Sequence, residues 1–346
     1  MRTFVIFEQL LRGRFMATPD QTPLLSGQQQ GTPRRIINFI GEQGFIVIFI
    51  LWALYLSVST NNFATAQNVF TILRQATIIG IVAIGAHFII LLGDIDLSLA
   101  SNLTLSGVVM ASLMVNQELP PLLAVLCALG LGALIGLVNG MVITRLKINA
   151  IITTLGMLSI LEGIAFIITQ GKTIFGDAIE VIKFLSRGTL LDAIPLPVIV
   201  LFVFYAAAFV VLGRTTYGAR VFAVGNNSKA AWLSGINVDR IKVLTYVLAG
   251  TLAAFGGVMQ VARQGTATGG MGSDFLFPVL TAVVLGGASL TGGRGKIVNT
   301  LIAAVFLTTI TNGMVLLGIS IYTQRVVSGA ILIIALSLDR LRTVRV

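Results

Sequence analysis

Long apolar segments, separated by short polar stretches, make up most of this chain from residue 42 onward. A helix needs about 20 apolar residues to cross a lipid bilayer. Apolar runs bounded by charged residues, Gly, Pro or Asn predict ten such helices, near residues 42–60, 70–92, 97–116, 121–144, 150–170, 197–213, 243–262, 275–290, 297–314 and 321–338. The eighth segment is short, which leaves open a break in that helix.

The composition excludes a soluble domain. Hydrophobic residues make up 56% of the chain and charged residues only 10%, whereas soluble domains carry about 25% charged residues. The 37 glycines fit a membrane protein, because small residues let membrane helices approach one another closely. The single cysteine, Cys127, lies in an apolar run, where we expect a small buried packing residue. We therefore expect an all-α polytopic membrane protein.

The distribution of basic residues predicts the orientation of the helices. With the N-terminus in the cytoplasm and ten alternating spans, the cytoplasmic side holds 17 of the 23 Lys and Arg residues. This excess agrees with the rule that basic loops stay on the cytoplasmic side. It also accounts for the net charge of +10 without a nucleic-acid partner. Both chain ends are then cytoplasmic.

The predicted domain organisation has three parts. Residues 1–41 are polar and typical of a disordered tail on the cytoplasmic side. Residues 42–339 form the membrane domain, in which 214–242 is a cytoplasmic loop, and residues 340–346 form a cytoplasmic C-terminal tail. The start of translation is left open between Met1 and Met16.

A short repeated sequence suggests internal symmetry. The tetrapeptide NGMV begins at Asn139 in the fourth predicted span and again at Asn312 in the ninth, and these two spans run in opposite directions. An inverted repeat that relates spans two to five with spans seven to ten, a common feature of transporters, would produce this pattern.

The segment GNNSKAAWLSGINVD, residues 225–239, interrupts the apolar sequence with a polar one. Asn227 or Ser228 is suited to cap the start of a helix, and Gly235 is suited to end it in the left-handed conformation. These signals predict a short cytoplasmic helix of about one and a half turns. We expect it to present Ala230, Ala231, Leu233 and Ile236 to another protein, although a loop helix that only covers the bundle is the alternative.

Four stretches of the chain resemble the permease subunits of ATP-binding-cassette (ABC) importers for ribose, arabinose, xylose and galactosides, the branched binding-protein-dependent permeases. The stretches are GDIDLSLAS (93–101), KINAIITTLGMLSILEGIAFIITQGK (147–172), GNNSKAAWLSGINVDRIKVLTYVLAG (225–250) and AVVLGGASLTGGRGKIVNTLIAA (282–304). The resemblance runs from about residue 65 to 339. It implies a type II importer fold in the bacterial inner membrane.

The resemblance also implies partners. They are a second permease copy or a paralogue, two ABC ATPase subunits docked below the short cytoplasmic helices, and a periplasmic sugar-binding protein that delivers a monosaccharide. The residues it implies for coupling to the ATPase are Gly225, Asn226, Asn227, Ala230, Ala231, Leu233, Ser234, Gly235 and Ile236. The chain departs from the family's pattern at Leu276 and Pro278, where carboxylates are frequent, and this leaves the sugar open.

Polar residues within or beside the apolar spans are candidates for the translocation path. They are Asp94, Asp96, Ser98, Asn102, Asn139, Gln260 and Asn312. Asp96 or Ser98 could instead cap the start of the third span. The amide side chains could each form a hydrogen bond from one helix to another. A half-helix end facing the path is the competing interpretation for 93–101.

We expect no catalytic, cofactor-binding or metal-binding residues. The sequence has a single histidine and no paired catalytic carboxylates. The stretch LGGASLTGGRGK lacks a P-loop, because Ile297 follows Lys296, so we expect a tight cytoplasmic hairpin there. ATP hydrolysis is therefore expected in a partner subunit. The competing function is a stand-alone secondary transporter of a small polar solute.

Overall fold

In the computed structural model of the protein, residues 32–190 and 194–344 are described, with side chains from 45 to 337. The chain divides into a short unit, Met1–Glu42, and a main unit, Gln43–Val346, which is the one considered below. Most of the predicted disordered tail, and both possible translation starts, lie outside the described residues. Residues 32–41 of that tail are helical and belong to α2, contrary to expectation.

The described residues are predominantly helical, as the sequence predicts. The helices are α2 Thr32–Ser59, α3 Ala66–Leu91, α4 Leu99–Val115, α5 Pro121–Arg145, α6 Ala150–Thr169, α7 Asp177–Glu180, α8 Phe184–Arg187, α9 Leu196–Arg214, α10 Thr216–Asn226, α11 Ser228–Leu233, α12 Val238–Gln264, the 3₁₀ helix η1 Ser273–Phe275, α13 Leu276–Leu285, α14 Ile297–Leu316 and α15 Ile321–Val344. Two-residue strands form two small antiparallel pairs, β1 Ile174–Phe175 with β4 Thr266–Ala267 and β2 Thr189–Leu190 with β3 Ile194–Pro195.

Six helices are long and apolar enough to cross a membrane, namely α3, α5, α6, α9, α12 and α14. Four shorter apolar helices, Phe45–Ser59, Leu99–Val115, Ser273–Leu285 and Ile321–Ser337, correspond to the other four predicted spans. The eighth predicted span is the one that departs most from a complete helix, because α13 has only 10 residues and is preceded by β4 and η1. The number of ten spans stays a prediction.

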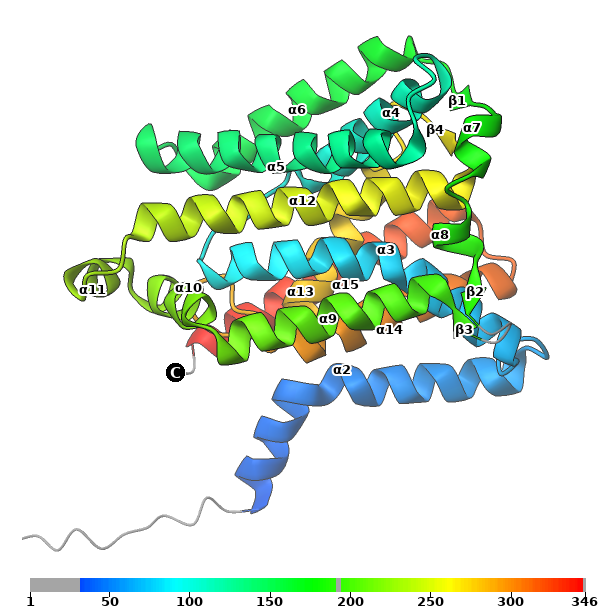
Figure 1. The fold of residues 1–346 in the computed structure, drawn as a ribbon. Helices are drawn as coiled ribbons and strands as arrows, with labels where there is room; N and C mark the ends of the chain where they lie inside the picture. The colour runs from blue at the N-terminus through cyan, green and yellow to red at the C-terminus, as the bar shows by residue number, and fades with distance from the viewer. Residues whose placement is uncertain (1–31, 191–193, 345–346) are drawn as a thin grey trace, which may run out of the picture. The chain divides into compact units, whose positions relative to one another are not determined.

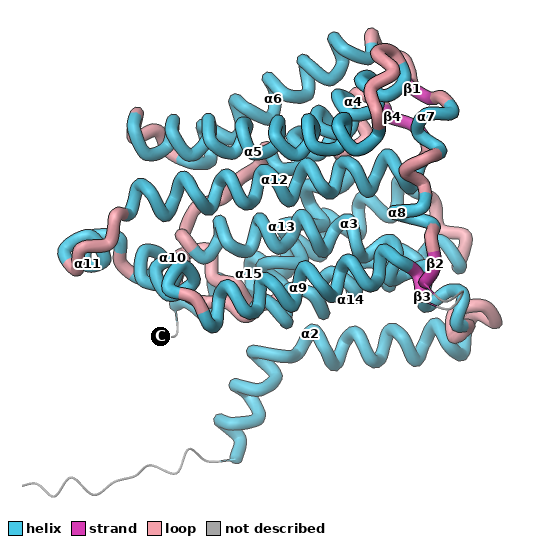
Figure 2. Tube along the Cα trace, viewed as in Figure 1, coloured by secondary structure: helices cyan, strands magenta, loops and turns pink. Residues whose placement is uncertain are grey.

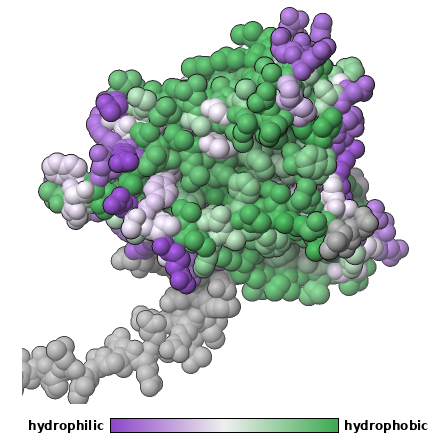
Figure 3. Space-filling model, viewed as in Figure 1, coloured by the Kyte–Doolittle hydropathy of each residue, from purple (hydrophilic) through white to green (hydrophobic). Residues whose placement is uncertain are grey.

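The helices of the main unit run side by side, with α10 and α11 at one end and the strands, α7 and α8 at the other (Figures 1 and 2). We call these the α11 end and the strand end. In Figure 3 a broad hydrophobic face separates hydrophilic side chains at the two ends. Such a band is what a bilayer core would require.

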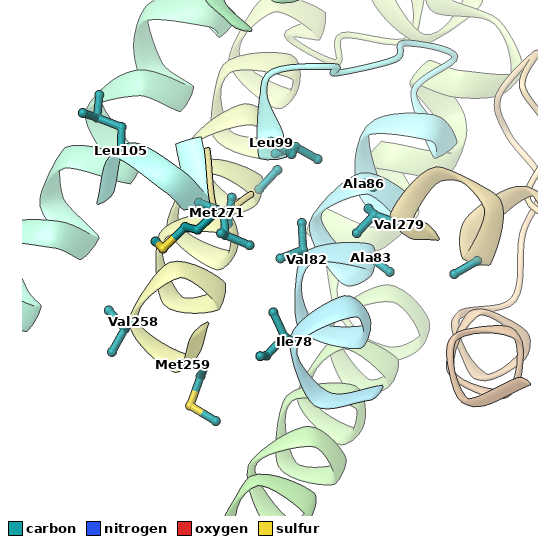
Figure 4. Close-up of a cluster of buried hydrophobic side chains, with 14 of the residues drawn as sticks. Ile78, Val82, Ala83, Ala86, Leu99, Leu105, Val258, Met259, Met271 and Val279 are labelled. Atoms are coloured by element: carbon teal, nitrogen blue, oxygen red, sulfur yellow. The ribbon is translucent and has the colours of Figure 1, made fainter. Parts of the chain in front are cut away.

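Helix α12 is central, packing against α3, α4 and α5. It approaches α5 very closely, because a Cβ on Gly136 would overlap the Tyr246 carbonyl oxygen and one on Gly250 would overlap that of Gly132. The largest buried cluster joins α3, α4, α12 and α13, with Ile78, Val82, Leu99, Val258 and Val279 among its members (Figure 4). Small residues at the backbone contacts and aliphatic ones between them build this core.

One packing prediction is wrong. Cys127 is exposed on the outer side of α5 and not buried, because α5 presents only one side to α12 and α4.

Candidate coupling and translocation site

The predicted short helix is present as α11, and local hydrogen bonds define both of its ends. Asn227 Oδ1 accepts the Ala230 N–H at 2.9 Å, so Asn227 is the N-cap. At the other end Gly235 has φ +83°, its N–H bonds the Trp232 carbonyl, and the Ile236 N–H bonds the Ala231 carbonyl. This is a Schellman ending, in which glycine avoids the strain of a left-handed residue. The sequence signals for this helix are therefore confirmed.

The exposed side of α11 differs from the predicted one. Trp232 and Leu233 are 66% and 70% exposed, whereas Ala231 is only 5% exposed and packs into the buried cluster beneath. Ile236 is half-buried against the same cluster. Ala231 and Ile236 thus hold the helix on the bundle, and Trp232 joins Leu233 on the open side.

An open groove of about 620 Å³ lies beside α11. It is formed by α11, the turn that follows, the first residues of α12 and Lys147 from the α5–α6 connection. Lys147 forms an ion pair with Asp239 at 3.5 Å across it. The groove therefore combines an exposed tryptophan with charged side chains from two segments distant in sequence.

Glycines join the α11 end to the end of α3 and to the hairpin between α13 and α14. The Gly293 N–H donates to the Leu91 carbonyl oxygen at 2.9 Å, and a Cβ on Gly225 would overlap that same oxygen. A Cβ on Gly293, whose φ is +71°, would overlap the side-chain oxygen of Asn226. We call the contact of Leu91, Gly225, Asn226 and Gly293 the glycine junction. It brings together the end of α3, the end of α10 and the α13–α14 hairpin. A hydrogen bond from the Ser289 N–H to the Arg294 carbonyl oxygen closes this hairpin.

The turn between α3 and α4 has an ion pair at its start. Lys242, in the first turns of α12, contacts both carboxylate oxygens of Asp94 at 2.8 and 3.0 Å. Their side chains are 20% and 13% exposed, so the pair is largely shielded from water. Shielding strengthens the attraction and raises the cost of losing one partner.

Asp96 lies deeper in the same turn, at 4% exposure. Its Oδ1 accepts the Ser98 N–H at 2.8 Å and the Ser98 hydroxyl at 2.6 Å, and the Asn139 amide donates to that hydroxyl at 2.9 Å. Ser98 occupies the N-cap position of α4 but makes no side-chain capping bond. Asp96 thus supports the start of α4, and it also borders a narrow pocket that Leu276 and Val279 of α13 line.

The other polar candidates connect helices. The Asn102 amide reaches the Gly132 and Gly250 carbonyls at 3.4 and 3.3 Å, which links α4 with α5 and α12. Asn312 exchanges two hydrogen bonds with Asn68, at 2.9 and 3.0 Å. Gln260 is 4% exposed, and its Oε1 has no hydrogen-bond partner among the described residues. The geometry favours interhelical bonding for Asn102 and Asn312.

Comparison with known families decides what kind of protein carries this arrangement. The family described as "Branched-chain amino acid transport system / permease component" matches residues 68–336, most of the chain. The chain belongs to this permease family.

Curated relatives cover the permease almost from end to end. The ribose import permease protein RbsC of Escherichia coli (strain K12) is 37% identical over 321 residues, which are 92% of this chain and 98% of the relative. RbsC of Bacillus subtilis (strain 168) is 37% identical over 318 residues, 90% and 98% of the two chains. The L-arabinose ABC transporter permease protein AraH of Azospirillum brasilense is 33% identical over 305 residues, 88% and 89%. No solved structure matches the permease.

Sequence reasoning located most of this region and missed part of it. In the permease, Asp96, Ser98 and Asn139 form one hydrogen-bonded group, while Gln260 and Asn312 are not part of it. The sequence gave no reason to pair Asp94 with Lys242 or to place Lys147 beside α11, because these partners are distant along the chain. The charges of these side chains were the only sequence signal available for these contacts.

Proposed function

We propose that this permease is the membrane-spanning subunit of an ABC importer that carries a monosaccharide, a pentose or a related sugar, into the cytoplasm. The relatives whose names specify ribose and arabinose support the class of solute. ATP is hydrolysed by a separate subunit, and a periplasmic sugar-binding protein supplies the substrate. The permease works with a second copy or a paralogue in the bacterial inner membrane, with both chain ends in the cytoplasm.

The observation that supports ATPase coupling best is the exposed side of α11. A large indole and a leucine in water are costly to leave uncovered, and such exposed apolar groups mark contact sites. Lys229 and Lys147 lie around the same groove, so an acidic rim on the partner would complement it. We infer that Trp232 and Leu233 enter the ATPase subunit, together with Asn227, Ala230 and Ser234 around them.

The alternative, a secondary transporter, has little support. Such a protein needs ionisable groups for the coupling ion inside the membrane. In the described residues, Glu162 of α6 is the one acidic side chain well inside a candidate span. A single carboxylate is a poor basis for ion coupling, so we retain the importer.

The test is sugar-stimulated ATP hydrolysis and uptake in membranes that contain the permease, its ATPase and its binding protein. Leu233→Asp and Lys229→Glu should abolish both activities while the permease still inserts. Val181→Asp adds a carboxylate to another exposed apolar position, near the strand end, and is the matched control that should leave both activities intact. Uptake that persists without any ATPase would overturn the importer proposal.

A further inference from the structure

The α13–α14 hairpin, residues 286–296, lies beside the base of α11. A Cβ on Gly293 would overlap the side chain of Asn226, and the next residue, Asn227, is the N-cap of α11. The hairpin and α11 are therefore neighbouring parts of one surface at the α11 end, although they are far apart in the chain.

Short-range hydrogen bonds fix the shape of this hairpin. The Ser289 carbonyl oxygen accepts the Gly292 N–H at 2.9 Å, and the hydroxyl oxygens of Ser289 and Thr291 lie 2.8 Å apart. Gly292 and Gly293 have φ angles of +85° and +71°, where glycine avoids the strain that other residues would meet. A loop that is already ordered loses little conformational entropy when a partner covers it. The hairpin is therefore suited to be a contact surface.

Two basic side chains of the hairpin are exposed. Arg294 and Lys296 form no ion pair with an acidic residue in the described part of the chain. Lys147, in the groove beside α11, differs from them because Asp239 already pairs with it. The hairpin thus adds two uncompensated positive charges to the surface that carries α11. Complementary charge makes an acidic protein surface the fitting partner.

The size of α11 indicates that its partner covers more than this helix. A stable protein interface includes about 20–30 residues from each partner, whereas α11 has only six residues. A subunit that covers Trp232 and Leu233 must therefore contact the segments around α11 as well. The hairpin touches the residue before the α11 N-cap, so it lies within the area that such a subunit covers.

The hairpin also leads directly to the pocket at Asp96. It follows α13, which ends at Leu285, and Leu276 and Val279 of α13 line that pocket. Helix α11 is connected to α12 instead. A movement of the hairpin would therefore reach a different helix from a movement of α11.

We propose that the α13–α14 hairpin is a second contact for the ATPase subunit, in which Arg294 and Lys296 bind acidic side chains of that subunit and the movement of the subunit reaches α13. This rests on the proposed function, in which the ATPase covers α11, and it adds a second surface and the charge that the partner carries there. Helix α11 supplies the apolar part of the contact and the hairpin the electrostatic part. The competing occupant is the anionic lipid of the inner leaflet, which also attracts basic residues near a membrane.

Photo-cross-linking tests the contact in the assembled transporter. In a Cys127→Ser background, Arg294→Cys labelled with a benzophenone maleimide should cross-link to the ATPase subunit. Phe184→Cys, exposed near the strand end, is the control and should not. Leu233→Cys tests the proposed function in parallel. Cross-linking from Leu233→Cys but not from Arg294→Cys would overturn the hairpin contact alone, whereas cross-linking from neither would count against the proposed function.

Charge reversal tests the electrostatic part of the contact. In nanodiscs of uncharged phosphatidylcholine, Arg294→Glu and Lys296→Glu should each raise the Kd for the purified ATPase subunit roughly tenfold at low ionic strength. The effect should shrink at high ionic strength, because salt screens exposed charges. Arg214→Glu, at the exposed end of α9 and separated from the hairpin contact by the length of α10, is the matched control and should leave the Kd unchanged.

The Lys296→Glu variant separates binding from folding. Lys296 is the N-cap of α14, where a negative charge favours the helix, so a weaker contact would not come from loss of α14. A wild-type Kd in uncharged nanodiscs, with a change only when anionic lipid is added, would assign the hairpin to lipid and overturn the proposal. In proteoliposomes with saturating ATPase, sugar uptake per ATP hydrolysed should fall in Arg294→Glu. An unchanged ratio would contradict the transfer of movement to α13.

Discussion

At the scale of single residues, Asp96 has the clearest expected effect. Asp96→Ala leaves the Ser98 N–H and hydroxyl without their acceptor in a buried site. A buried group that loses its partner costs about 1–3 kcal/mol. We expect a lower thermal unfolding midpoint of the purified permease, and a smaller loss for Asp96→Asn. The exposed Asp177→Ala serves as control. Unchanged stability together with lost uptake would instead assign Asp96 to the sugar path.

The ion pair of Asp94 and Lys242 is expected to respond to charge exchange. Lys242→Asp places two carboxylates at a site where the side chains are 13–20% exposed. The free energy of unfolding should fall by more than the ~1 kcal/mol that an exposed ion pair contributes and by less than the ~3–5 kcal/mol lost when a buried pair is broken. The exchange Asp94→Lys with Lys242→Asp should recover part of it, measured as a double-mutant cycle of unfolding free energies. Additive losses would show that the contact contributes nothing.

At the scale of elements, the glycine junction connects α10 with the end of α3 and with the α13–α14 hairpin. Gly225→Ala forces the backbone of α10 away from the Leu91 carbonyl oxygen, which accepts the Gly293 N–H. We expect sugar-stimulated ATPase activity and uptake to fall together, with the permease still present in the membrane. Gly130→Ala in α5 adds a methyl group in open space and should change neither. Wild-type activity of Gly225→Ala would show that this contact is dispensable.

Predictions made from the sequence at this scale succeeded where short-range signals act. The ends of α11, at Asn227 and Gly235, are set by hydrogen bonds between residues no more than five positions apart. The local pattern of residue types is therefore sufficient to predict this helix. The prediction that Ala231 is exposed on α11 was wrong, because the burial of this residue depends on α10 and α12 beneath it.

The NGMV tetrapeptides lie on α5, which ends near α11, and on α14, which begins near the glycine junction. These helices are antiparallel, as an inverted repeat requires, and the repeat itself stays a prediction.

At the scale of the whole molecule, the distribution of basic residues makes the orientation testable. In a Cys127→Ser background expressed without the ATPase, Trp232→Cys should react with a membrane-impermeant maleimide only after permeabilisation. Phe184→Cys, exposed near the strand end, should react in intact cells. The expectation follows from retention of basic segments in the cytoplasm. The reverse labelling pattern would invert the topology and remove α11 from the reach of a cytoplasmic ATPase.

The sequence by itself determined that this chain is a helical membrane protein, where its apolar segments lie and where a polar helix interrupts them. These properties follow from transfer of side chains into lipid and from local capping, which act over one helix at a time. Tertiary structure alone decided that Asp94 meets Lys242, that Gly225 and Gly293 meet at Leu91, and that Cys127 and one side of α6 remain uncovered. Each of these contacts depends on how helices far apart in the chain approach one another. The hydrophobic pattern of the sequence does not encode that approach, because the buried and lipid-facing sides of a membrane span are equally apolar.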